Sequence, residues 1–260
     1  MLRPKNNKTK PRIKHRPFLK WAGGKFRLTD DLNRVFPKRK QCLIEPFVGA
    51  GAVFLNSHFE RYILADINPD LINLFNIVKE NVDAYIEACK PIFFAENANT
   101  ADYYYAQRDA FNQSSDPFER SVLFLYLNRF GFNGLCRYNS KNEFNVPFGA
   151  YKTHYFPEDE LRYFAHKAQS AVFLCADFQQ TFELADKHSV IYCDPPYAPL
   201  PQDTNFTGYA GNAFGLEHQK NLAECAKKAQ KEKQISVVIS NHDTKFTREI
   251  YKGAKFKRVK

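Results

Sequence analysis

The chain has 260 residues, 44% of them hydrophobic and 25% charged, a balance typical of a globular protein that buries a core. Its formal net charge of +10 predicts attraction to polyanions such as nucleic acid, with a merely soluble basic surface as the alternative. No apolar run long enough for a membrane helix is present, and the basic N-terminus lacks the apolar stretch of a secretory signal, so we expect no membrane partner.

The cysteines also bear on the class of protein. The chain has six, which are widely spread and contain no C-x-x-C pair. A disulfide framework or a zinc site would require tighter, more ligand-like spacing. We therefore expect reduced thiols, no metal site and a cytoplasmic location.

The N-terminal segment 1–16 carries seven basic residues and no acid. With so few apolar residues it cannot offset the entropy lost on ordering, so we predict a basic disordered tail. Contact with phosphates and plain solubility are both compatible with such a tail.

The next part of the chain alternates between short apolar runs and helical patterns. After a Gly-rich loop we predict, in order, a helix over about 26–36, a strand at 42–46, a helix from Ala52, a strand at 62–66 and a helix over 69–88. This order of strand, glycine loop, helix, strand and acid is typical of a βαβ nucleotide-binding half.

Residues 91–165 interrupt the alternation, because helical patterns are followed by a loop rich in Asn, Gly and aromatic residues. The helices are predicted at 101–112 and 117–129, and the loop at 130–151. Alternation then resumes with strands at 171–175, 190–194 and 236–240 and a helix at about 215–232. We predict an α/β fold with a mostly parallel sheet, a catalytic domain of residues 17–90 and 166–260, and an inserted subdomain of residues 91–165.

The loop at residues 45–51 lies between a predicted strand and a predicted helix. Its Gly49 and Gly51 let a ligand approach the backbone closely. The third glycine of a dinucleotide-binding pattern is replaced by Phe54, so an adenosine ligand without phosphates fits better. Asp66 ends the next strand, where a carboxylate can accept from ribose hydroxyls; capping of the following helix is the alternative.

The segment from Asp194 to Tyr197 reads Asp-Pro-Pro-Tyr and follows an apolar strand, where an open α/β sheet binds its ligands. Because the prolines restrict the backbone, the Asp194 carboxylate and the Pro195 carbonyl can point together into a cleft and accept both hydrogens of an exocyclic amine. The amine nitrogen is then aimed at an electrophile, and Tyr197 can stack on the attached ring. A rigid structural turn is the alternative.

At this point the chain resembles the bacterial DNA adenine methyltransferase family that acts on GATC sites. The matching segments are FLKWAGGK at 18–25, EPFVGAGAVFLN at 45–56, LADINPDLINLFNIVK at 64–79, LFLYLNRFGFNGLCRYN at 123–139, FNVPFG at 144–149, CDPPYAPL at 193–200 and ISNHDT at 239–244. The resemblance implies a Rossmann-like methyltransferase sheet that uses S-adenosylmethionine, with an inserted, mainly helical DNA-recognition subdomain. Asp-Pro-Pro-Tyr alone would also suit enzymes acting on RNA or protein glutamine; the segment 123–149 points to DNA.

The resemblance also implies a cofactor site. The matching residues are Trp21, Lys25, Gly49, Gly51, Asp66, Asp177 and Asp194. Asp66 matches the acid on the cofactor ribose, Asp194 the catalytic acid beside the methionine end, and Asp177 a contact to the cofactor adenine. Asp194, Pro195 and Tyr197 are the expected catalytic residues, and no metal is implied.

The residues implied in DNA recognition are Lys20, Phe132, Asn133, Leu135, Arg137 and Pro147. Arg137 matches an arginine that reads guanine, since a guanidinium fits the O6 and N7 acceptors; a surface salt bridge is the alternative. Leu135 and Pro147 suit thymine methyl groups, Lys20 and Asn133 make polar contacts, and Phe132 can wedge into the duplex. The target adenine must leave the base stack to reach Asp194.

Two departures from the family pattern are visible. Ala150 stands where a basic residue is expected, and the family continues beyond residue 260, so we expect a C-terminally shortened member with an exposed sheet edge. The resulting hypothesis is a monomeric, nucleoid-associated enzyme that methylates adenine N6 in duplex GATC. The alternatives are a GATC-binding protein with little or no catalysis, an amino-methyltransferase acting on RNA, and an NAD-dependent dehydrogenase.

Overall fold

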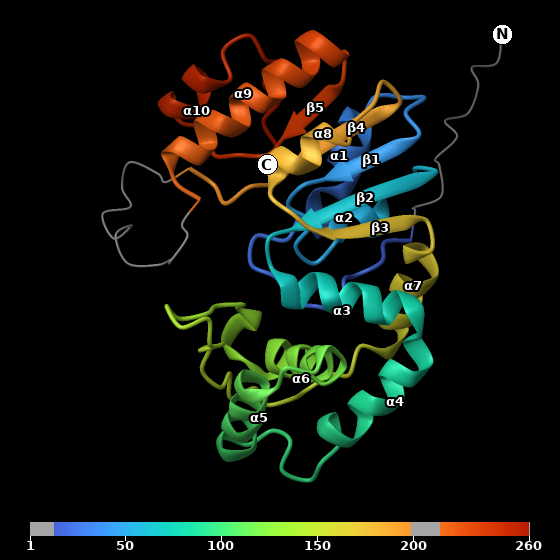
Figure 1. The fold of residues 1–260 in the computed structure, drawn as a ribbon, viewed down its shortest axis with the longest axis vertical. Helices are drawn as coiled ribbons and strands as arrows, with labels where there is room; N and C mark the ends of the chain where they lie inside the picture. The colour runs from blue at the N-terminus through green and yellow to red at the C-terminus, as the bar shows by residue number, and fades with distance from the viewer. Residues whose placement is uncertain (1–12, 199–213, 260) are drawn as a thin grey trace, which may run out of the picture.

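The computed structural model of the chain describes residues 13–198 and 214–259, and one parallel sheet forms its centre (Figure 1). The strands are β1 (Cys42–Glu45), β2 (Arg61–Asp66), β3 (Ala171–Cys175), β4 (Ser189–Cys193) and β5 (Ser236–Ile239), in the order β3-β2-β1-β4-β5. In the centre, Ile44 pairs with Ile63 of β2 and Ile191 of β4. Strands β1 and β4 are buried along their whole length, which explains their continuous apolar runs. The predicted α/β fold is confirmed.

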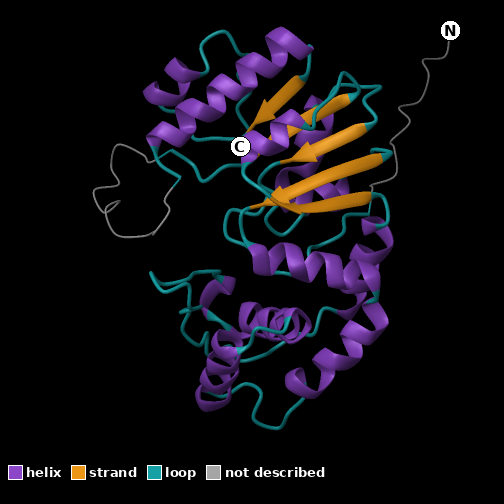
Figure 2. Ribbon diagram, in the orientation of Figure 1, coloured by secondary structure: helices purple, strands orange, loops and turns teal. Residues whose placement is uncertain are grey.

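Helices cover both faces of the sheet (Figures 1 and 2). Within the described residues, the helices are η1 (Phe26–Leu28), α1 (Thr29–Val35), α2 (Ala52–Asn56), α3 (Pro69–Glu80), α4 (Val82–Phe93), α5 (Ala101–Gln113), α6 (Pro117–Phe130), η2 (Phe132–Gly134), α7 (Glu158–Ala168), α8 (Phe178–Glu183), α9 (Leu216–Lys233) and α10 (Lys245–Ile250). Successive side chains of a strand point to opposite faces, so Leu43 joins a core that includes α3 and α7, whereas Ile44 joins a second core with α8 and α9.

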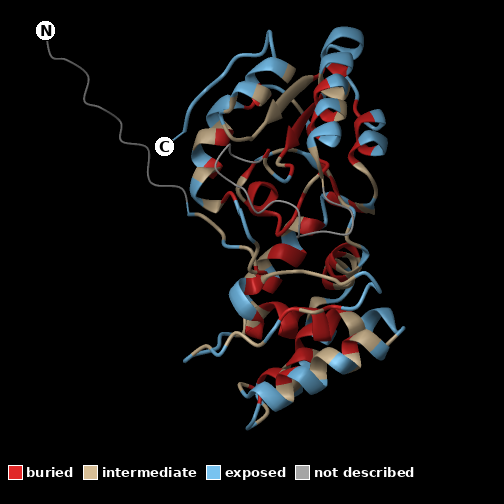
Figure 3. Cartoon of the chain, turned by 90° about the vertical axis from the view of Figure 1, so that its left-hand side faces the viewer, coloured by how far each residue is buried: buried red, intermediate tan, exposed pale blue. Residues whose placement is uncertain are grey.

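Helices α4, α5 and α6 form a helical block that extends the molecule away from the sheet (Figure 1). Helix α6 packs against α3, α4 and α5, and nearly every residue from Ser121 to Phe130 is buried. Figure 3 shows buried residues continuing from the sheet into this block. The expected limits of the insert, at residues 91 and 165, fall inside α4 and α7, so the division into domains stays a prediction.

The helix predicted over 69–88 is wrong as a single helix. Asn81 separates α3 from α4 with φ −150° and ψ 82°. Its N–H donates to the Ile77 carbonyl at 3.1 Å, and its side chain accepts from the Ala84 N–H at 3.0 Å. One asparagine therefore ends the first helix and caps the second. Its side chain competes with the backbone for helical hydrogen bonds, and the spacing of apolar residues does not reveal this competition.

The expected tail 1–16 lies mainly outside the described residues. For residues 13–16, which are described, the prediction of disorder is wrong. The His15 ring stacks on Tyr163 with 3.4 Å between ring centroids, and the backbone N–H of His15 donates to Asn56 Oδ1 at 2.9 Å. Partners on the folded domain hold this segment, and they cannot be seen from the composition of the segment itself.

Replacing Leu125 of α6 by alanine should lower the free energy of unfolding by about 2–5 kcal/mol, because Leu125 is fully buried and the change leaves a cavity. Urea unfolding followed by circular dichroism measures this loss. The matched control is Leu184→Ala, at a leucine that is 49% exposed, for which we expect a change within about 0.5 kcal/mol. Equal losses in the two variants would contradict the burial of α6.

Candidate active site

A cleft of about 2120 Å³ opens at the carboxyl ends of β1, β2 and β4, and residues of α6 contribute to its opposite wall. Ligands of open α/β sheets bind at this edge. The cleft is lined by these residues predicted from the sequence: Lys20, Trp21, Lys25, Gly49, Asp66, Arg137, Asp177, Asp194, Pro195 and Tyr197. Gly51 lies behind the lining, where its φ of 75° shapes the turn into α2.

The glycine loop packs closely beneath the Trp21 indole. Gly49 has a φ of 48°, and a Cβ atom there would lie 2.8 Å from Trp21 Nε1, so a larger residue does not fit. The Gly49 N–H donates to Asp66 Oδ2 at 3.2 Å. Burial raises the pKa of Asp66, although hydrogen bonds from the backbone of Asn68 and Gly49 oppose this shift. The capping alternative for Asp66 is wrong, because the N-cap of α3 is Asn68.

Asp194, directly after β4, forms a largely buried ion pair with Lys25. Lys25 Nζ lies 2.8 Å from Asp194 Oδ2, donates to the Gly23 carbonyl at 2.5 Å and sits 4.8 Å from the centre of the Tyr197 ring. Burial raises the pKa of Asp194, although Lys25 opposes this shift. Burial alone would lower the pKa of Lys25, but its interactions with Asp194 and Tyr197 together outweigh burial and raise that pKa. The N-terminal loop and the segment after β4 are thus joined by charge.

Glu45, the last residue of β1, also lines the cleft and was missed by the sequence analysis. It is only 2% exposed. Among the described residues, neither Glu45 Oε1 nor Asp194 Oδ1 has a hydrogen-bond partner. Burial, with a contribution from Asp194, raises the pKa of Glu45 well above its usual value. The available sequence signal was an acid at a strand end beside the glycine loop.

Asn128 of α6 joins two loops on the other wall. It is 1% exposed, accepts from the Lys20 N–H at 2.8 Å and donates to the Lys20 carbonyl at 2.8 Å and the Gly134 carbonyl at 3.3 Å. Lys20 Nζ donates to the Arg129 carbonyl and lies 3.8 Å from the centre of the Tyr151 ring. Burial, helped by the charge of Arg129, lowers the pKa of Lys20 to about 8.

The guanidinium of Arg137 is held in place by two hydrogen bonds to Asn145. Its Nε donates to Asn145 Oδ1 at 2.7 Å and its Nη2 to the Asn145 carbonyl at 3.0 Å. Among the described residues, no carboxylate lies within ion-pair distance of Arg137, whose guanidinium is bound by Asn145 instead.

The remaining residues expected at the DNA lie beside the cleft rather than on its lining. Phe132 is 47% exposed, and its N–H donates to the carbonyl of exposed Pro147 at 2.9 Å. Asn133 is exposed with a φ of 53°, and Leu135 is half-buried. The structure therefore brings η2 and the segment around Pro147 together next to the wall that carries Lys20.

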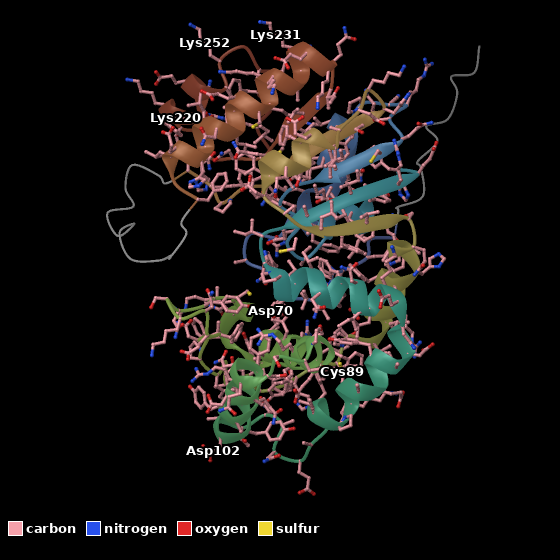
Figure 4. All side chains as sticks on the ribbon, in the orientation of Figure 1. Asp70, Cys89, Asp102, Lys220, Lys231 and Lys252 are labelled. Atoms are coloured by element: carbon pink, nitrogen blue, oxygen red, sulfur yellow. The ribbon has the colours of Figure 1, made fainter. Side chains whose placement is uncertain are left out.

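Asp70, labelled in Figure 4, connects the two walls from the first turn of α3. It accepts from Arg120 Nε at 2.9 Å and Nη2 at 3.0 Å, and from the Tyr138 hydroxyl at 2.6 Å. Nearby, Asn68 Nδ2 donates to Cys136 Sγ at 3.2 Å. The loop that carries Arg137 is consequently tied to the same turn that follows Asp66.

Asp177 caps α8 by accepting from the Gln179 N–H at 2.8 Å.

Every cysteine is described, and each is a free thiol, as expected. In the described part of the chain, no group of three His, Cys, Asp or Glu side chains is arranged to hold a metal ion. No helix there combines the length and apolar character needed to cross a membrane.

Comparison with known proteins gives consistent matches. The model of the family "D12 class N6 adenine-specific DNA methyltransferase" matches residues 21–260. A DNA adenine methylase of Haemophilus influenzae is 82% identical over 260 residues, which cover 100% of this chain and 91% of that protein. DNA adenine methylases of Vibrio cholerae and Escherichia coli K12 are each 59% identical over 247 residues, which cover 95% of this chain and 88% of theirs.

Replacing Lys25 by methionine should raise the pKa of Asp194 further, because the buried carboxylate loses its cation. The folded variant then binds that proton more tightly than the unfolded chain does. Its free energy of unfolding should therefore fall more steeply than that of the unsubstituted chain as the pH rises from about 4 to neutrality. Carboxyl ¹³C NMR titration and urea unfolding at several pH values measure both effects. Exposed Lys227→Met is the control, and an unchanged Asp194 pKa in Lys25→Met would contradict the ion pair.

Proposed function

The chain belongs to the family of D12 class N6 adenine-specific DNA methyltransferases, and from this membership we propose that it transfers methyl groups from S-adenosylmethionine to adenine in duplex GATC sites. Membership makes it an adenine-specific DNA methyltransferase with DNA as its partner, which confirms the family predicted from the sequence. It also excludes the dehydrogenase and the RNA enzyme. The observation that carries the finer proposal is the cleft itself, where Asp194, Lys25 and the glycine loop face a wall carrying Lys20 and Arg137.

The cleft suits S-adenosylmethionine in three respects. The Trp21 indole, packed against the backbone of Gly49, presents a flat aromatic surface to the cleft, against which a planar group can lie. Asp66 is a half-buried acceptor for ribose hydroxyls, and Asp177 lies within the same lining, where we place the cofactor adenine. The oxygens of Glu45 and Asp194 that lack partners among the described residues are acceptors for an ammonium group, so we assign the methionine end to them.

In the proposed reaction, Asp194 and the Pro195 carbonyl accept the two hydrogens of adenine N6. The cofactor supplies an electrophilic methyl group on a positively charged sulfur. No base has to remove a proton before the attack, because the two hydrogen bonds direct the lone pair of the neutral amine toward the methyl group. As the bond from N6 to the methyl carbon forms, the bond from that carbon to sulfur breaks and S-adenosylhomocysteine leaves. The methylated amine then loses its extra proton to the Asp194 carboxylate, which already accepts a hydrogen bond from it. Tyr197 stacks on the adenine, which must leave the duplex at a cost of a few kcal/mol. Lys25 keeps the Asp194 carboxylate charged in its buried position.

The opposite wall supports recognition of duplex DNA. Nε and Nη2 of Arg137 are engaged by Asn145, whereas no described residue engages Nη1, so the outer edge of the guanidinium is open to guanine O6 and N7. We assign Lys20 and Asn133 to polar contacts and Leu135 and Pro147 to thymine methyl groups. Exposed Phe132 is assigned to the wedge beside the extruded base. We propose that one monomer carries this whole site.

Methyl transfer should occur to a duplex containing GATC and not to one containing GTTC. The measurement is incorporation of tritiated methyl from S-adenosylmethionine, and Asp194→Ala should reduce it to background because the amine loses an acceptor. Label on both duplexes would contradict the assigned site. Binding of GATC without label would establish the alternative of a binding protein with little or no catalysis.

Glu45→Gln should weaken binding of S-adenosylmethionine by about tenfold or more, since an amide replaces an acceptor for a charged group. Isothermal titration without DNA gives the dissociation constant directly. Glu183→Gln, at an exposed glutamate of α8, is the matched control and should bind as the unsubstituted chain does. Equal affinities for all three proteins would remove Glu45 from the cofactor site.

A further inference from the structure

The backbone between Asp194 and Ala198 has few N–H groups that could hold it in one orientation by hydrogen bonding. Pro195 and Pro196 have no N–H, so this stretch cannot donate hydrogen bonds at two successive positions. The carbonyl of Pro195 and the ring of Tyr197 must nevertheless point to defined places in the cleft. The structure fixes them from behind the cleft lining.

Two side-chain amides lie behind this segment and bind its backbone. Gln219, in the first turns of α9 and 1% exposed, donates from Nε2 to the Pro196 carbonyl at 2.7 Å. Its Oε1 accepts from Asn241 Nδ2 at 2.8 Å. Asn241 follows β5, and its Oδ1 accepts from the Ala198 N–H at 3.1 Å and the His242 N–H at 2.9 Å. We call Gln219 and Asn241 the amide pair.

The chemistry of its partners gives the amide pair one orientation. The Ala198 N–H can only donate, so an oxygen of Asn241 must face it. The nitrogen of Asn241 then faces Gln219, which must present its own oxygen there. The nitrogen of Gln219 is thereby left for the Pro196 carbonyl, which can only accept. Only this assignment of oxygen and nitrogen in the two side-chain amides satisfies all the hydrogen bonds.

This arrangement holds the peptide groups on both sides of Tyr197. The Pro196 carbonyl belongs to the preceding peptide group and the Ala198 N–H to the following one, so the backbone of Tyr197 is fixed at both ends. His242 Nδ1 contacts the Ala198 carbonyl at 2.9 Å, and its ring meets Tyr197 edge-on with 4.8 Å between centroids. Because the Pro196 ring locks its own φ, a fixed Pro196 carbonyl also restricts the direction of the Pro195 carbonyl.

We propose that Gln219 and Asn241 are positioning residues for methyl transfer, which set the direction of the Pro195 carbonyl and the Tyr197 ring without touching the substrate. Neither residue belongs to the cleft lining. The inference rests on the proposed function, in which that carbonyl and that ring receive the adenine. Misplacement by about 1 Å in such a site can cost about 10²-fold in rate.

Gln219→Glu and Asn241→Asp test the proposal, because each keeps the side-chain size but replaces a donor by an acceptor. At neutral pH an ionised carboxylate then opposes a carbonyl oxygen in one variant and Gln219 Oε1 in the other. When the new carboxyl is protonated, it donates again and the pair re-forms. We expect kcat to fall by about 10²-fold at neutral pH and to recover as the pH is lowered, with KM for cofactor and DNA little changed.

Gln219→Leu, which can neither donate nor accept, should stay slow at every pH. Gln230→Glu makes the same chemical change at an exposed position of α9 and should have the pH profile of the unsubstituted chain. The two carboxyl variants lie on different elements, so one that does not fold leaves the other to decide. Profiles that run parallel to that of the unsubstituted chain in both would overturn the proposal.

Hydrogen exchange at the Tyr197 and Ala198 amides, measured by NMR on the free protein, separates this inference from the proposed function. After correction for intrinsic rates, exchange should be faster in both carboxyl variants at neutral pH and slow again at low pH. If the unsubstituted chain transfers no methyl from S-adenosylmethionine, the proposed function fails. Unchanged exchange in both variants would overturn the positioning role whatever the activity.

Discussion

The ion pair between Lys25 and Asp194 is the interaction on which the cleft depends. Three neighbouring parallel strands, β1, β2 and β4, each lead into an acid on the cleft lining, because their carboxyl ends meet at one edge of the sheet. Burial raises the pKa of all three acids, and removing a cation from such a site leaves an uncompensated charge. Lys25, at the end of the loop before η1, opposes the rise in the pKa of Asp194. The N-terminal loop is thus a structural part of the edge of the sheet that lines the cleft.

The two walls of the cleft depend on each other in the same way. Asp70 holds Arg120 of α6 and Tyr138 of the loop after η2, and the turn that contains it also follows Asp66. On the far side Asn128 binds the backbone of Lys20, five residues before the lysine of the ion pair. A displacement of the helical block would therefore be felt on the sheet side through polar contacts that are largely shielded from water, where hydrogen bonds are stronger than on the surface.

The sequence predicted the strands and the ligand-binding loops, which show as continuous apolar runs and short motifs. It did not predict helix ends that depend on the hydrogen-bond partner of a single polar side chain. Apolar runs located the strands, and the glycine loop and Asp-Pro-Pro-Tyr located the edge that binds ligands. The break at Asn81 and the capping of α3 by Asn68 rather than Asp66 were missed, since both depend on a local contest between side chain and backbone. Glu45 and the amide pair were missed for another reason: an acceptor without a partner, or a residue behind a wall, is visible only once distant segments are brought together.

The hold of Asn145 on Arg137 has a consequence for how such a protein searches a long duplex. A guanidinium that is already oriented loses little further rotational freedom when it meets a base, so the favourable contact is not diminished by the ordering of a long side chain. Under the proposed role, a matching guanine can form its hydrogen bonds with Arg137 as soon as it reaches the side chain. At a mismatched base, the held side chain cannot easily turn to another partner. Residence on unmatched sequence would then be short, and the time saved at each wrong site grows with the length of DNA that has to be scanned.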